Sequence, residues 1–232
     1  MKIRNFAVFA FAAAATLAQA VVIMDQIGPN NTYQSANIYA SQDFEPAFDA
    51  YDLATIDDFT TTSTGFVLRK VDAVIGFWAG ATGPGGITAY RLSIYSSPVA
   101  AGNNLAGDIA HLVLGLHQVT ATPWNLGNGF QHLVAIPGLS INLTPNTTYW
   151  VGLIPVMNLS GVGQVGIAET VGFAGTFPMN SNNVQANPGQ GFGMGRFWTV
   201  GVNSAYRIDA VPEPSSLAAL ALGALALLRR RK

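Results

Sequence analysis

The chain has 232 residues, no cysteine, and charged side chains at only 10% of its positions. Its formal net charge is −1, but six of the eleven basic residues lie at the two extreme ends, so residues 21–210 carry five basic and eleven acidic side chains. This composition excludes a basic surface for nucleic acid, a disulfide and a thiolate metal site.

The first twenty residues have the order of a secretory signal. Lys2 and Arg4 precede an apolar, alanine-rich run, and Ala18 and Ala20 place small residues where signal peptidase accommodates them. We therefore predict a signal peptide, formed as an N-terminal helix over 1–20 and cleaved after Ala20.

Residues 21–210 alternate between apolar and polar side chains and show no helical periodicity. This length suits a single domain with its own core. The expected strands are 69–78, 90–95, 112–119, 131–136, 139–143, 147–155, 164–168, 196–202 and 205–208. Short strands at this spacing, joined by turn-rich segments, predict an antiparallel β-sandwich or jelly roll.

Six of the eleven acids of this domain fall in one short segment: Asp43, Glu45, Asp49, Asp52, Asp57 and Asp58. Carboxylates suit Ca²⁺, which makes these residues candidates for a calcium site, although no EF-hand loop is present. The alternative is that they are solvated turn and cap residues. A pair of them at the right separation could also serve as the acid and base of a glycosidase.

Motifs for other chemistry are missing from the sequence. The three histidines lack the spacing of zinc ligands, and no Gly-x-Ser-x-Gly elbow occurs. The alternating glycines over 189–195 do not form a phosphate-binding pattern, and we interpret them as a flexible loop. We therefore expect that the chain is not an enzyme and that it binds no cofactor other than calcium. Carbohydrate binding stays open, and Trp124, in a loop, is the candidate for a sugar contact.

The C-terminal segment has three parts in a fixed order. Pro212, Glu213 and Pro214 precede an unbroken apolar run over 217–228, and Arg229, Arg230 and Arg231 follow it with a final lysine. Two prolines around Glu213 forbid a helix and favour an extended form that a protease can bind. As a hydrophobic helix the apolar run would span roughly 18 Å, less than the ~30 Å of a bilayer core. A permanent anchor and a processed sorting signal are both consistent with it.

This tail closely resembles the PEP-CTERM sorting tail of Gram-negative bacteria that make extracellular polysaccharide. The resemblance implies that Pro212, Glu213 and Pro214 are recognised by a membrane-embedded exosortase and that the arginine cluster is a retention signal. It also implies signal peptidase and a transient stay in the inner membrane. A similar tail follows ice-binding domains, but this chain has one threonine cluster, 60–62 with Thr64, instead of the regular rows that ice binding requires.

These observations divide the chain into a signal peptide (1–20), a β-sandwich domain (21–210) and a sorting tail (211–232). The expected protein is a secreted or cell-envelope component, with the bulk of the chain on the periplasmic or extracellular side. Its expected role is non-enzymatic, structural or adhesive, among the extracellular polysaccharide of a biofilm. The alternative is a carbohydrate-binding module, and a secreted hydrolase is the third class.

Overall fold

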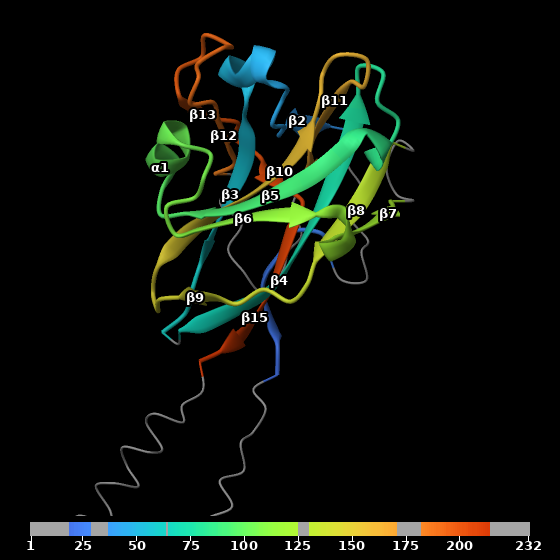
Figure 1. The fold of residues 1–232 in the computed structure, drawn as a ribbon. Coiled ribbons are helices and arrows are strands. Elements are labelled where there is room, and N and C mark those ends of the chain that lie inside the picture. Colours follow the sequence, from blue (N-terminus) through green and yellow to red (C-terminus); the bar gives the residue numbers. More distant parts are fainter. Residues whose placement is uncertain (1–18, 29–36, 64, 125–129, 171–181, 214–232) are drawn as a thin grey trace, which may run out of the picture.

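The computed structural model describes residues 19–28, 37–63, 65–124, 130–170 and 182–213. In these ranges the strands form two sheets, and neighbouring strands pair antiparallel (Figure 1). The predicted all-β sandwich is confirmed. The predicted signal helix and hydrophobic tail helix fall outside the described residues. Among the residues that are described, no helix is both long and apolar enough to cross a membrane.

The elements occur in three groups. The nine-stranded sheet contains β1 (Val21–Asp25), β2 (Ile38–Ala40), β4 (Phe66–Trp78), β7 (Thr120–Pro123), β8 (Gln131–Ile136), β9 (Ile141–Leu143), β11 (Gln164–Thr170), β14 (Asn203–Ser204) and β15 (Tyr206–Pro212). The six-stranded sheet contains β3 (Ala54–Thr60), β5 (Ile87–Tyr95), β6 (Ala110–Gly115), β10 (Thr148–Met157), β12 (Val184–Ala186) and β13 (Phe197–Thr199). The short helices are η2 (Pro46–Tyr51), η3 (Pro84–Gly86), α1 (Pro98–Asn103) and η4 (Leu116–Gln118).

Strand β4 is the central strand of the nine-stranded sheet and pairs with four others. Its first half pairs with β9 and β15, and its second half pairs with β8 and β11. The second half is almost continuously buried, because one face meets the main core while Val74, on the other face, packs with Ile27 and Trp124. A strand covered on both faces has an unbroken apolar sequence, which is why it was predictable.

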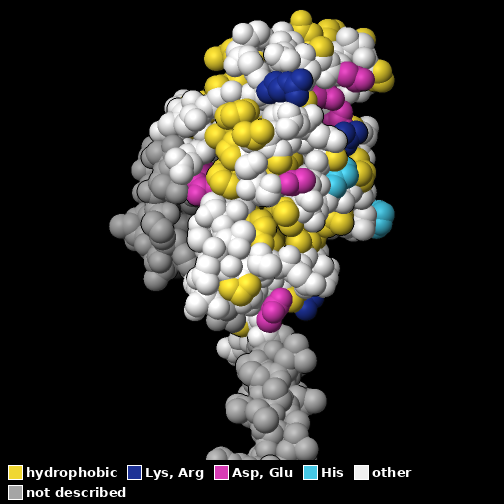
Figure 2. All heavy atoms as spheres, turned by 90° about the vertical axis from the view of Figure 1, so that its left-hand side faces the viewer, with side chains coloured by type: hydrophobic (Ala, Val, Ile, Leu, Met, Phe, Trp, Pro, Cys, Tyr) yellow, Lys and Arg dark blue, Asp and Glu magenta, His cyan; other side chains and the backbone are white. Residues whose placement is uncertain are grey.

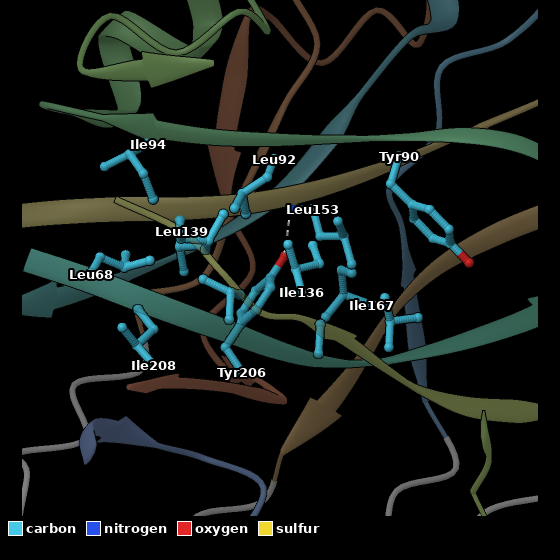
Figure 3. Close-up of a cluster of buried hydrophobic side chains, with 14 of the residues drawn as sticks. Leu68, Tyr90, Leu92, Ile94, Ile136, Leu139, Leu153, Ile167, Tyr206 and Ile208 are labelled. Carbon is cyan, nitrogen blue, oxygen red and sulfur yellow. Dashed lines mark hydrogen bonds between the residues drawn. The ribbon is translucent and has the colours of Figure 1, made fainter. Parts of the chain in front are cut away.

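The main core lies between the two sheets. It contains large aliphatic side chains from both, among them Leu68 and Ile167 from one sheet and Leu92 and Leu153 from the other (Figure 3). Tyr206 links the two layers, because its hydroxyl donates to Thr55 O at 2.9 Å and accepts from Leu153 N at 3.0 Å. Complete burial raises the pKa of Tyr206 far above its usual range.

Two sequence predictions need correction. The strand predicted over 112–119 ends at Gly115, because Leu116–Gln118 turns into η4 and the Gln118 side chain accepts the Gly115 N–H at 2.9 Å. The acids Asp57 and Asp58, taken as loop residues, lie inside β3. A buried strand tolerates Asp57 because its carboxyl oxygens accept the backbone N–H groups of Asp58 and Ser204, at 2.9 and 2.6 Å.

Both ends of the domain leave it at the same pole (Figure 1). Strand β1 begins at Val21, directly after Ala20, and Val21 pairs with Ala210 of β15. The opposite pole carries η2 and the loop between β12 and β13 (Figure 1). Strand β15, which leads into the tail, therefore ends at the far end of the domain from η2.

Candidate functional site

An aromatic cleft lies at the pole opposite the termini. It encloses about 220 Å³ and is lined by Phe44, Phe48, Tyr51, Leu159, Gln164 and Phe192. The rings of Tyr51 and Phe192 meet edge to face, with centroids 5.2 Å apart, and the two side chains are 40% and 42% exposed. Large rings that keep a free face are suited to contact a ligand or a partner.

Helix η2 supplies one wall of the cleft. Pro46 starts it, which fits because the first helical position needs no N–H donor. Phe48 N donates to Glu45 O at 2.8 Å, and the Asp52 carboxylate accepts the Phe44 N–H at 2.8 Å. The segment is thus closed at both ends, and it holds the Phe48 ring 6.2 Å from that of Tyr51.

The loop between β12 and β13 supplies the facing wall. Gly191 N and Asn187 Nδ2 both donate to Ala50 O, at 2.8 and 2.9 Å. A Cβ atom on Gly189 or Gly191 would come within 2.6 and 2.5 Å of the Ala50 backbone. The alternating glycines, predicted to form a flexible loop, therefore let this loop pack directly against η2 and place Phe192 over Tyr51.

A third wall is the turn between β10 and β11, which carries Leu159. The Glu45 carboxylate accepts the N–H groups of Leu159 and Ser160, at 2.6 and 3.0 Å. Hydrogen bonds from Ser160 and Leu159 lower the pKa of Glu45 to about 2. Glu45 therefore remains an anion at any ordinary pH and holds this turn against η2.

Carboxyl groups lie behind the cleft. Asp43 pairs with Arg91 at 2.5 Å, and burial raises the pKa of Asp43. Burial, opposed by the Phe44 N–H and reinforced by Asp43 and Asp49, raises the pKa of Asp52 to about 7. The charges of Asp43, Asp49 and Asp52 therefore interact behind the cleft.

The six candidate calcium ligands do not form one cluster. Asp49 lies in η2, and Asp43, Glu45 and Asp52 flank η2 in sequence. Asp57 and Asp58 lie on β3. Across the part of the chain that the structure describes, no set of three histidine, aspartate or glutamate side chains could hold a metal ion. Glu45 and Asp57 instead bind backbone N–H groups.

The prediction that Trp124 contacts a sugar is wrong. Its side chain is only 6% exposed and packs with Ile27, Val74, Ala168 and Ala205. A buried ring cannot stack on a saccharide. The acidic segment supplies the exposed ring of Tyr51 and the half-buried ring of Phe48 instead, and the alternation of acids with Phe44, Phe48 and Tyr51 was the available signal.

Further exposed apolar side chains lie beyond the cleft, on and near the face formed by α1 and β13. Figure 2 shows hydrophobic side chains gathered on this side of the molecule. Exposed members are Val99, Met194 and Phe197, which are 55%, 59% and 40% exposed. Arg196 lies between the last two in sequence and donates to Asn103 Oδ1 at 2.9 Å. We call Val99, Met194 and Phe197 the apolar rim.

The described sorting and processing residues lie at the other pole. Pro212 ends β15 and pairs with Phe66, while the exposed Ala20 directly precedes β1. Glu213 follows Pro212, and its N–H donates to Gly65 O at 2.8 Å. The remaining predicted residues, Ala18, Pro214, Arg229, Arg230 and Arg231, lie outside the described residues.

The comparison with known families identifies the tail. Residues 210–232 match the family model of the PEP-CTERM protein-sorting motif. The chain is thus an all-β protein with a PEP-CTERM sorting tail, which implies exosortase-dependent export to the cell envelope or surface. No curated protein matches the chain.

Proposed function

We propose that this chain is a non-enzymatic adhesive component of the cell envelope or extracellular matrix, and that it makes its contacts through the aromatic cleft and the apolar rim. The observation that carries the proposal is the arrangement of the two poles. The sorting tail begins at one pole, in β15, and the cleft lies at the other. A domain held by its tail would present the cleft outward.

The chemistry of the cleft supports a contact surface. Tyr51 and Phe192 are fixed by hydrogen bonds between η2 and the facing loop, so little conformational entropy is lost when a partner covers them. Met194 and Phe197 extend the exposed apolar area. Apolar groups that remain in water on a folded protein commonly mark a site of interaction.

A second candidate function, carbohydrate binding, is favoured by the Tyr51 and Phe192 pair. Flat aromatic faces pack on the C–H faces of sugar rings, and Gln164 in the cleft lining offers an amide for sugar hydroxyls. In this version of the proposal the partner is extracellular polysaccharide.

The test is attachment of cells to their own matrix. Replacing Tyr51 and Phe192 together by alanine should reduce attachment at least about tenfold, because two aromatic anchors are each worth more than ~1 kcal/mol at an interface. Phe130→Ala is the matched control, since Phe130 is 44% exposed and does not line the cleft. Equal loss of attachment in the control, or full attachment in the double variant, would contradict the proposal.

A further inference from the structure

The sorting motif and the folded domain share residues. The matched motif begins at Ala210, yet Ala210 is fully buried in β15 and pairs with Leu68 of β4. Pairing continues through Val211 and Pro212. Strand β15 therefore extends two residues past the domain boundary predicted at Ala210, and the Pro-Glu-Pro sequence starts inside the sheet instead of on a linker.

Gly65, just before β4, receives the next residue of the motif. The Glu213 N–H donates to Gly65 O at 2.8 Å, which extends the ladder by one bond. The Glu213 side chain lies over Gly65, because a Cβ atom there would be 2.8 Å from the Glu213 Cδ and 2.9 Å from its Oε2. Both the backbone and the carboxylate of Glu213 thus contact Gly65, and a side chain at position 65 would displace that carboxylate.

We propose that this contact between Gly65 and Glu213 is a clasp that restrains exosortase processing, so that the folded domain competes with the enzyme for its own sorting motif. A protease binds an extended substrate largely through the substrate's backbone groups. Proline has no backbone N–H, so Glu213 supplies the one such donor of the Pro-Glu-Pro sequence, and the domain already uses it. The motif must leave Gly65 before another protein can bind it in extended form.

The clasp concerns removal of the tail and is independent of what the cleft binds. One net backbone hydrogen bond and a packed side chain correspond to a modest equilibrium in favour of the closed form, about fivefold. The clasp therefore slows processing of the folded precursor without preventing it, and it lengthens the time that the domain stays joined to its tail.

The experiment follows tail removal from the full-length chain by pulse-chase labelling in a host with an active exosortase. Gly65→Ala pushes the carboxylate away, and Gly65→Val fills its place. Processing should accelerate in the order wild type, alanine, valine, by less than the fivefold of the whole clasp, because the backbone bond from Glu213 to Gly65 O remains. Gly85→Ala and Gly85→Val are matched controls, because a Cβ atom on Gly85 meets nothing within 4 Å.

The Tm of each processed product separates release of the clasp from loss of the fold, since an unfolded precursor would also be cut faster. Unchanged or slower processing in Gly65 variants that keep the wild-type Tm overturns the proposal. A second measurement needs no variant: in detergent-solubilised full-length protein, the Glu213 amide should exchange its hydrogen roughly fivefold slower than in an unfolded chain. Exchange at the unfolded rate also overturns it.

Discussion

At the scale of single residues, the Tyr206 hydroxyl is the clearest link between the two sheets. It bonds both Thr55 O and Leu153 N in a region without water access. Tyr206→Phe should lower the free energy of unfolding by about 2 kcal/mol, because it leaves two buried backbone groups without a partner. Tyr90→Phe is the control, since no hydrogen bond to the Tyr90 hydroxyl is found among the described residues. Urea unfolding gives both values, and equal losses in the two variants would contradict this role.

At the scale of elements, the cleft depends on the contact between η2 and the loop from β12 to β13. Gly191→Ala would place a Cβ atom 2.5 Å from Ala50 O, a backbone atom that cannot swing aside. We expect the loop to separate from η2 and attachment to fall as far as in the double aromatic variant. The Tm should drop less than in Tyr206→Phe, because the main core is untouched. Wild-type attachment by Gly191→Ala would show that the packed loop is not needed.

The elements also show how far the sequence could predict the fold. The strand expected over 131–136 coincides with β8, because its alternation reflects one buried face. Strand β3 was missed, because Asp57 and Asp58 read as loop residues and only contacts with Ser204, far along the chain, explain the burial of Asp57. The cleft was missed for the same reason: Tyr51 and Phe192 meet only after η2 and a distant loop pack together.

At the scale of the whole molecule, buried carboxyl groups set the pH dependence of stability. Burial raises the pKa of Asp57 to about 8 and that of Asp52 to about 7, from a usual value of 3.8. Between these pH values the folded state holds protons that the unfolded state has lost. The contribution of these carboxyl groups to the free energy of unfolding is therefore complete below about pH 4 and disappears as the pH rises through 8. The Tm should fall between pH 5 and pH 9. Asp57→Asn, which cannot ionise, should make the decrease of Tm with pH smaller. An unchanged decrease would show that other groups cause it.

The sequence could not predict that the ends of the domain and the cleft lie at opposite poles. The signal peptide and sorting tail could be predicted because each is a contiguous segment with its own physical pattern. The positions of the two ends depend on the pairing of Val21 with Ala210, and the position of the cleft depends on the pairing of β12 with β3. Such long-range pairings place the start of the tail and the cleft at opposite poles, and no local pattern records them.

The most direct test of the outward-facing cleft uses the absence of cysteine from the chain. Met194→Cys, on the apolar rim, and Val113→Cys, on β6, replace side chains that are 59% and 63% exposed. A membrane-impermeant maleimide is applied to cells in intact matrix and again after the matrix is removed. If the cleft pole binds the matrix, Met194→Cys is protected until the matrix is removed, while Val113→Cys reacts equally in both states. Equal reactivity of the two cysteines in intact matrix would contradict the account.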